Sequence, residues 1–190
     1  MKITAIETIR LAEFANILFV QVHTDAGISG LGETFFGAEA VAAYLHETAA
    51  PILLGRDPLE IDRISTALSG YVGYQNSGAE MRGNSAIDIA LWDIFGKHTG
   101  LPIYQLLGGK SRDDIHVYNT CAGYKYIRTS TGQRSDNWGL AEQTGPYEDL
   151  DGFLHRADEV ALSLLDEGIT GMKIWPFDPY AEATNGAYIS

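Results

Sequence analysis

The sequence has little of what several classes of protein require. It contains one cysteine, Cys121, among 190 residues, so no internal disulfide framework can form, which fits a reducing cytoplasm. We interpret Cys121 as a small buried residue at a strand end rather than as a nucleophile. No apolar run reaches the roughly 20 residues of a membrane-spanning helix, and residues 1–10 lack the apolar core of a signal peptide. A cytoplasmic protein without membrane contact is therefore expected.

Positive charge is also scarce. Lysine and arginine number 13 against 25 aspartate and glutamate residues, which gives a formal net charge of -12. Binding to a phosphate backbone needs clustered Lys and Arg, and no such cluster is present, so no nucleic acid is expected as a partner. The sequence also lacks a phosphate-binding glycine loop, a Cys/His zinc spacing and a serine nucleophile elbow.

What the sequence does contain is a well-marked helix near its middle. Ser85, followed three residues later by Asp88, is typical of a helix cap and predicts that the helix begins at Ala86. Gly100 and Pro102 predict its end. Apolar residues recur at the spacing of one helical face and predict an inward stripe, made of Ile87, Ala90, Leu91, Ile94 and Phe95.

The order of residues in this stretch says more than the helix pattern. At fixed spacing it contains Ser85-Ala86-Ile87-Asp88, Ala90-Leu91, Asp93-Ile94, Gly96-Lys97, Pro102-Ile103 and Leu106-Leu107-Gly108. This order resembles the signature of the mandelate racemase and muconate lactonizing enzyme group of the enolase superfamily. Gly83 departs from it, because alanine is expected there. Residues 22–33, VHTDAGISGLGE, also resemble the opening of that family, whose small N-terminal domain caps the mouth of a barrel.

Residues 1–112 are predicted to form this α+β capping domain. The pattern predicts a three-stranded antiparallel meander, in which Asp25-Ala26-Gly27 makes a hairpin turn. Ile3, Ala5 and Ile9 are expected on one side of the first strand. The predicted strands are Lys2–Arg10, Ile17–His23 and Ser29–Glu33, and the predicted helices before Ala86 are Ala38–Ala50, stopped by Pro51, and one that starts at Asp57-Pro58.

Residues 113–190 are predicted to begin an incomplete (β/α) barrel of the TIM type. Strand, helix and strand over residues 115–120, 151–167 and 170–175 make a βαβ unit, and Asp178-Pro179 starts a further helix. Such a unit exposes unpaired strand edges, so it is stable only in a larger sheet or barrel. We therefore expect the chain to be the front part of a longer one, or to be completed by a partner.

The resemblance implies a magnesium-dependent enzyme that abstracts the proton α to the carboxylate of a small-molecule substrate. Dehydration of a sugar acid is the favoured reaction. Racemisation, epimerisation, cycloisomerisation and a non-catalytic binding or structural relative are the alternatives. The resemblance also implies a homo-oligomer and metal ligands on later barrel strands, so no metal ligand is expected in these 190 residues, which alone should be inactive.

Lys173 is the predicted catalytic residue. It ends an apolar strand, at the position where the family has the first lysine of a Lys-x-Lys pair beside the substrate carboxylate. The second position holds Trp175, a candidate for substrate binding that has no basic atom. The resemblance then implies a base on another strand, a histidine paired with an acid, while Lys173 stabilises the enolate. The alternative is a lysine that only reaches solvent at the barrel rim.

Three further residues are candidates for substrate binding. Asn119, at the first strand end, either bonds substrate or caps the turn. Tyr124 lies in a long loop, residues 122–150, which is rich in aromatic and basic side chains. This loop is either functional, or a packing insertion or oligomer contact. Phe14, beside Glu13, resembles part of a specificity loop over the site, and a plain surface loop is the alternative.

Overall fold

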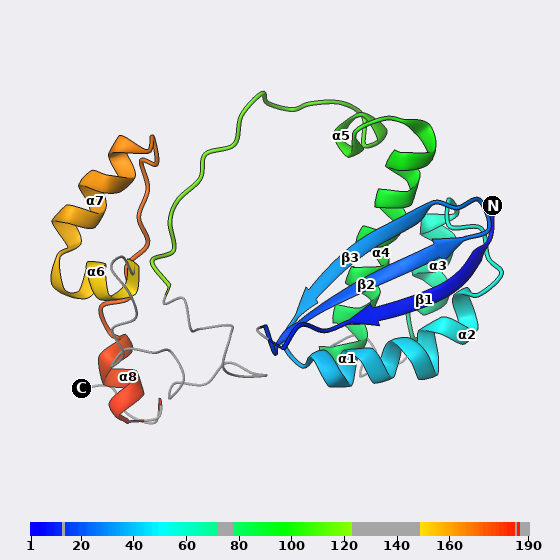
Figure 1. The fold of residues 1–190 in the computed structure, drawn as a ribbon, viewed down its shortest axis with the longest axis horizontal. Helices are drawn as coiled ribbons and strands as arrows, with labels where there is room; N and C mark the ends of the chain where they lie inside the picture. The colour runs from blue at the N-terminus through cyan, green and yellow to red at the C-terminus, as the bar shows by residue number, and fades with distance from the viewer. Residues whose placement is uncertain (13, 72–77, 123–148, 185, 187–190) are drawn as a thin grey trace. The chain divides into compact units, whose positions relative to one another are not determined.

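The computed structural model describes residues 1–12, 14–71, 78–122, 149–184 and 186. The chain divides into two compact units, Met1–Ser111 and Arg112–Ser190, called here the first and the second unit. Figure 1 labels the strands and the α-helices of both. No helix among the described residues is long and apolar enough to cross a membrane.

The first unit is built on a three-stranded antiparallel sheet in the order β1-β2-β3. The strands span Ile3–Ile9, Ile17–Thr24 and Ser29–Phe35, which confirms the predicted meander. Gly27 in the turn between β2 and β3 has a φ of 74°, a conformation that glycine adopts without strain. Alternate residues of β2 face the core and are fully buried, namely Leu18, Val20 and Val22.

The prediction that Ile3, Ala5 and Ile9 lie on one side of β1 is wrong in part. Ile3 is buried, but Ala5 is exposed. The register between β1 and β2 shifts between Ile3 and Ala5, and such an irregularity moves the following side chains to the opposite face of the sheet. Ile6 therefore packs against the core instead.

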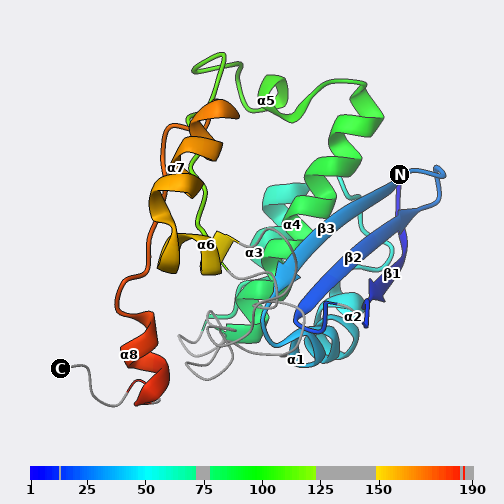
Figure 2. The same ribbon diagram turned by 60° about the vertical axis from the view of Figure 1, so that its left-hand side comes forward.

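One long helix, α4 (Gly78–Thr99), covers one face of this sheet. Figures 1 and 2 show it lying along β3 and β2. The predicted stripe is confirmed at four positions and not at Phe95, which is only partly buried. The four fully buried members are Ile87, Ala90, Leu91 and Ile94.

Two glycines of β3 let α4 lie directly on the sheet. A Cβ atom at Gly30 would overlap the carbonyl oxygen of Ala90, and one at Gly32 would overlap that of Ala86. Any side chain at either position would push the helix off the strand.

The predicted start of α4 at Ala86 is wrong. The helix begins at Gly78, and Ser85 is an exposed residue inside it. Gly83 is buried against Tyr44, whose Cδ1 would lie 2.7 Å from an added Cβ. Tertiary packing of this kind stabilises the earlier turns and outweighs the local capping signal at Ser85.

The helix after the sheet continues through Pro51 instead of stopping there. α1 (Ala38–Tyr44) runs into a π-helical turn, η1 (Leu45–Ala49), and then into α2 (Ala50–Leu53). Proline has no N–H and its ring crowds the carbonyl four residues earlier. The wider turn of η1 just before Pro51 accommodates both effects.

The next helix, α3 (Ile61–Leu68), begins after the predicted Asp57-Pro58 start. Asp57 instead stabilises a turn, because its Oδ1 accepts a hydrogen bond from the Leu59 N–H at 3.0 Å. Ile64 and Leu68 of α3 are buried. The short α5 (Ile103–Leu106) follows α4.

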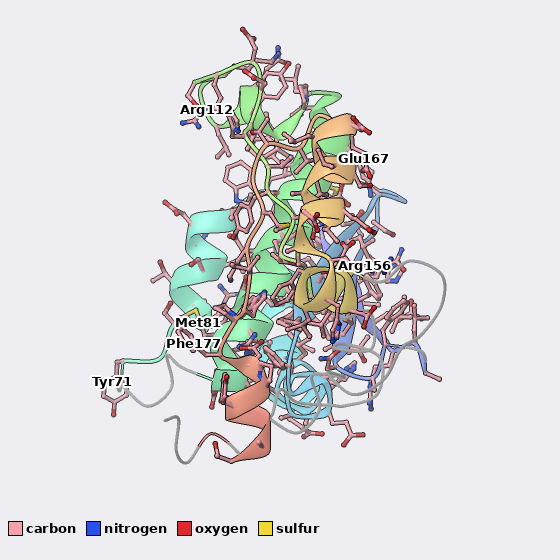
Figure 3. All side chains as sticks on the ribbon, turned by 90° about the vertical axis from the view of Figure 1, so that its left-hand side faces the viewer. Tyr71, Met81, Arg112, Arg156, Glu167 and Phe177 are labelled. Carbon is pink, nitrogen blue, oxygen red and sulfur yellow. The ribbon has the colours of Figure 1, made fainter. Side chains whose placement is uncertain are left out.

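The second unit contains α6 (Asp149–His155), α7 (Ala157–Asp166) and α8 (Asp178–Ala183). One continuous helix was expected over residues 151–167, but the backbone breaks at Arg156, with φ -147° and ψ 49°; Figure 3 labels this residue at the break. Gly152 lets the two helices pack closely, because an added Cβ would lie 2.5 Å from the Val160 Cγ2.

The two strands predicted for the second unit are not formed as strands in its described residues. One parallel bridge joins Asn119 to Met172. An isolated pair of short segments gains little stability without further strands beside it, which accounts for the single bridge. The small core of the unit comprises Cys121, Leu150, Phe153, Val160 and Leu164.

Candidate functional site

The two bridged segments of the second unit meet at Asn119. The Asn119 N–H donates to the Gly171 carbonyl at 3.0 Å, and the Lys173 N–H donates to the Asn119 carbonyl at 2.8 Å. In a parallel pair these bonds fix which residues stand beside one another. They bring three of the predicted site residues, Asn119, Lys173 and Trp175, into one part of the unit.

Lys173 and Trp175 contact each other. The Lys173 Nζ lies 3.9 Å from the centroid of the Trp175 ring, well inside the range of about 6 Å for a cation–π interaction. The Trp175 Nε1 donates to the Thr120 carbonyl at 2.6 Å, so the ring is tied to the first segment. Lys173 is exposed, and its ammonium is therefore held over the ring while it stays open to solvent.

The side chain of Asn119 is bonded within the protein at both ends. Its Oδ1 accepts a hydrogen bond from the Cys121 N–H at 2.7 Å, and its Nδ2 donates to the Asp149 Oδ2 at 2.8 Å. Asp149 is the first residue of α6, so the second bond ties that helix to the bridge. The bond from the Cys121 N–H supports the turn-capping role of Asn119. Substrate binding by Asn119 stays a prediction.

Burial changes the acidity of two groups around this bridge. Burial raises the pKa of the Cys121 thiol above its ordinary value of 9.0, and the negative charge of Asp149 raises it further. Such a thiol is neutral near pH 7 and is a poor nucleophile. Burial also raises the pKa of the Asp178 carboxyl, while the Lys173 ammonium lowers it.

Two predicted substrate-binding residues lie elsewhere. Phe14 belongs to the first unit, in the loop between β1 and β2, where its N–H donates to the Leu11 carbonyl and its carbonyl accepts from the Ile17 N–H, both at 3.0 Å. Tyr124 lies outside the described residues, as does Glu13. The roles of Phe14 and Tyr124 stay predictions.

Sequence reasoning gave no role at this site to Asp149 or Thr120. An aspartate at a helix start is a common capping signal. Nothing local predicts, however, that its carboxylate bonds a side chain 30 residues earlier. The Thr120 carbonyl is a backbone group, which a pattern of side chains cannot single out.

Magnesium does not fit the described residues. They contain no group of three or more His, Cys, Asp or Glu that could hold a metal ion. The Asp149 Oδ1 is buried and has no hydrogen-bond partner among these residues. One such oxygen falls far short of the roughly octahedral set of ligands that Mg²⁺ requires.

A separate hollow of about 330 Å³ lies in the first unit. The Tyr44 hydroxyl donates to the Asn84 Oδ1 at 2.7 Å beside it. Burial raises the pKa of Tyr44, the hydrogen bond to Asn84 lowers it, and the charge of Glu80 raises it. The lining carries one carboxylate and no basic side chain; it consists of Tyr44, Thr48, Ile52, Ala67, Leu68, Ser69, Gly70 and Glu80.

Known proteins are similar in sequence to both units. Residues 3–108 match the family model described as the mandelate racemase / muconate lactonizing enzyme, N-terminal domain. A solved enolase of the mandelate racemase subgroup from Agrobacterium tumefaciens is 54% identical, with a TM-score of 0.76. The match covers 100% of this chain and 42% of that chain.

Two further relatives carry names or ligands that bear on chemistry. A D-mannonate dehydratase from Novosphingobium aromaticivorans is 37% identical over 175 residues, which cover 81% of this chain and 44% of that protein. A solved enolase from Pantoea ananatis with bound d-gluconate and Mg is 39% identical, with a TM-score of 0.55, over 63% of this chain and 30% of that chain. This chain thus spans less than half the length of each of these relatives.

Proposed function

The chain belongs to the mandelate racemase and muconate lactonizing enzyme family of the enolase superfamily, and from this premise we propose that the whole protein dehydrates a sugar acid. The first unit, a three-stranded sheet with helices, is the N-terminal capping domain of that family. We propose that the second unit begins the barrel domain. The D-mannonate dehydratase that is 37% identical to this chain over 175 residues supports a sugar acid as substrate.

Dehydration of a sugar acid removes a proton and a hydroxyl group from neighbouring carbons. A base takes the proton from the carbon α to the carboxylate, the β-hydroxyl leaves with a proton as water, and the resulting enol becomes a keto acid. Negative charge develops on the carboxylate oxygens as the α proton leaves. A positive group fixed beside these oxygens lowers the barrier.

The placement of Lys173 is the observation that carries this proposal. Its ammonium is held 3.9 Å from the Trp175 ring centroid, next to the parallel bridge at Asn119, and it is exposed to solvent. In barrels of this kind the chemistry takes place at the carboxyl ends of the parallel strands. We propose that the segment carrying Lys173 is one of these strands, so that its ammonium is suited to bind a carboxylate and to stabilise its developing charge.

The base and the metal ligands belong to residues outside those described. Trp175 offers a ring and one N–H donor and has no basic atom, so a lysine base at this position is ruled out. We expect a histidine paired with an acid to take the α proton. We also propose Mg²⁺ as the cofactor, a choice supported by the magnesium in the Pantoea ananatis relative.

An isomerase of the same family is the second candidate. The Agrobacterium tumefaciens relative, 54% identical, is described only as an enolase of the mandelate racemase subgroup and not as a dehydratase. Racemisation, epimerisation and cycloisomerisation begin with the same loss of the α proton. They differ from dehydration in the product, which has the same composition as the substrate because a proton is returned to the carbon skeleton or another group adds to it.

Mass analysis of the product separates these candidates. The whole protein should be incubated with Mg²⁺ and a panel of sugar acids that begins with D-mannonate and D-gluconate. A dehydratase gives a keto acid lighter by one water, detectable by reaction with semicarbazide. A product of unchanged mass would assign an isomerase, and no turnover of any acid in the panel would contradict both proposals.

A further inference from the structure

We propose that Asp149 and Asn119 form a positioning pair that fixes where the Lys173 ammonium stands. The inference rests on the function proposed for Lys173. In the described part of the chain, Asp149 is linked to this lysine through Asn119 and the backbone bridge, so its role is to position and not to react.

The pair begins at the first residue of α6. The Asp149 Oδ2 accepts a hydrogen bond from the Asn119 Nδ2 at 2.8 Å. A hydrogen bond to a charged acceptor is roughly twice as strong as one between neutral groups. The bond therefore anchors the Asn119 side chain to a helix that is distant in the sequence.

Asn119 passes this constraint to the second segment. The backbone of Asn119 forms hydrogen bonds with the residues on both sides of Met172. Its carbonyl accepts from the Lys173 N–H at 2.8 Å, and its N–H donates to the Gly171 carbonyl at 3.0 Å. The main chain of Lys173 is thus fixed relative to Asn119. Since side chains alternate along an extended segment, this register also decides which way Lys173 points.

The turn after Asn119 shows that this arrangement is tightly held. Cys121 has a φ of 48°, a strained conformation for a residue other than glycine, which persists only where the surroundings impose it. The Asn119 Oδ1 accepts the Cys121 N–H at 2.7 Å and so holds this turn. Between the two residues, the Thr120 carbonyl accepts the Trp175 indole N–H at 2.6 Å. The Asn119 side chain, by holding this turn, therefore also sets the position of the Trp175 ring beside the Lys173 ammonium.

The emission of Trp175 reports the position of Lys173 without any need for turnover. A cation 3.9 Å from the ring centroid perturbs the emission of an indole, and replacing Lys173 with Met calibrates the size of the effect. The emission of Trp175 in each variant of the whole protein is obtained by subtracting the emission of the same variant that also carries Trp175→Phe. Circular dichroism verifies that each variant is folded.

Three substitutions test the pair. Asp149→Ala should reproduce most of the emission change caused by Lys173→Met, and Asp149→Asn, which keeps a weaker neutral acceptor, should give an intermediate change. Asp151→Asn is the matched control on the same helix, because the Asp151 carboxylate lies 3.2 Å from His155 and 3.9 Å from Arg156. It should leave the Trp175 emission unchanged.

Kinetics give the second readout. In a protein active on a sugar acid, Asp149→Ala should lower kcat on the order of 10- to 100-fold, the size expected for a misplaced group, with KM changed less than kcat. Unchanged Trp175 emission in both folded Asp149 variants would overturn the positioning role even in an active enzyme. If Asp149→Ala does not fold, the shift in Asp149→Asn decides. Absence of activity in the unmodified protein would refute the proposed function and leave the emission test in force.

Discussion

At the scale of single residues, the site depends on contacts that restrict one flexible side chain. A lysine has four rotatable bonds, and holding its ammonium in one place opposes a large rotamer entropy. The cation–π contact with Trp175 contributes about 0.5–1 kcal/mol at an exposed position. That is enough to favour one position of the ammonium while leaving it free to adjust to a substrate.

Lys173 and Trp175 could be selected from the sequence because they stand at the two positions of the family's Lys-x-Lys pair, and Asn119 because it ends a predicted strand. Asp149 could not, because its role comes from a contact with Asn119, 30 residues away. The break at Arg156 was missed for a similar reason. The apolar period of residues 151–167 continues across it, while Gly152 and Val160 pack in a way that requires a bend.

Tyr44 gives a prediction at this scale, because its raised pKa links the stability of the first unit to pH. The folded chain keeps the phenol proton after the unfolded chain has lost it, so stability falls as the pH rises above the ordinary value of 10.0. Tyr44→Phe loses the hydrogen bond to Asn84 and should cost about 1 kcal/mol near neutral pH.

Urea unfolding at neutral pH and above the ordinary tyrosine pKa provides the measurement. The free energy of unfolding should fall more steeply with pH in the unmodified protein than in Tyr44→Phe. The difference in this free energy between the two proteins should therefore become smaller as the pH rises. Every other residue is the same in both proteins, so its contribution to the free energy of unfolding cancels in the comparison. A gap that stays constant with pH would contradict the assignment.

At the scale of elements, the contact between α4 and β3 holds the first unit together. The strands and the buried stripe of α4 were predictable because each follows a simple period. The start of α4 and the passage of the helix through Pro51 were not. The early start depends on the packing of Tyr44 against Gly83. The passage through Pro51 depends on the π-helical turn η1 just before the proline.

Gly32→Ala tests that contact. The new Cβ would overlap the Ala86 carbonyl oxygen of α4, so the free energy of unfolding should drop by at least about 2 kcal/mol. Leu31→Ala is the control, since Leu31 lies on the same strand with 48% of its surface exposed, and it should change stability by less than about 1 kcal/mol. Equal effects of the two substitutions in urea unfolding would show that α4 does not rest on β3 in this way.

At the scale of the whole molecule, the two units differ in how much core each contains. Among the described residues, the first unit buries sixteen hydrophobic residues in one cluster, whereas the cluster of the second has five. Chemistry and stability are therefore divided between them. The candidate site lies in the second unit, whereas most of the buried hydrophobic residues in the described part of the chain lie in the first.

Removal of metal should separate activity from the stability of the first unit. Treatment of the whole protein with EDTA should abolish turnover, and added Mg²⁺ should restore it. The unfolding of the first unit should not change, because no group of described residues could hold the ion. Full activity in EDTA would contradict the proposed cofactor, and destabilisation of the first unit would place a metal ligand within it.

The central claim is that Lys173 serves the loss of an α proton from a carboxylate substrate. The most direct measurement is the rate at which the α-proton signal of a sugar acid disappears in D₂O, followed by NMR, for the whole protein and for Lys173→Met. The account predicts loss of the signal with the unmodified protein and a rate on the order of 100-fold lower in the variant. Equal rates in the two proteins would contradict it.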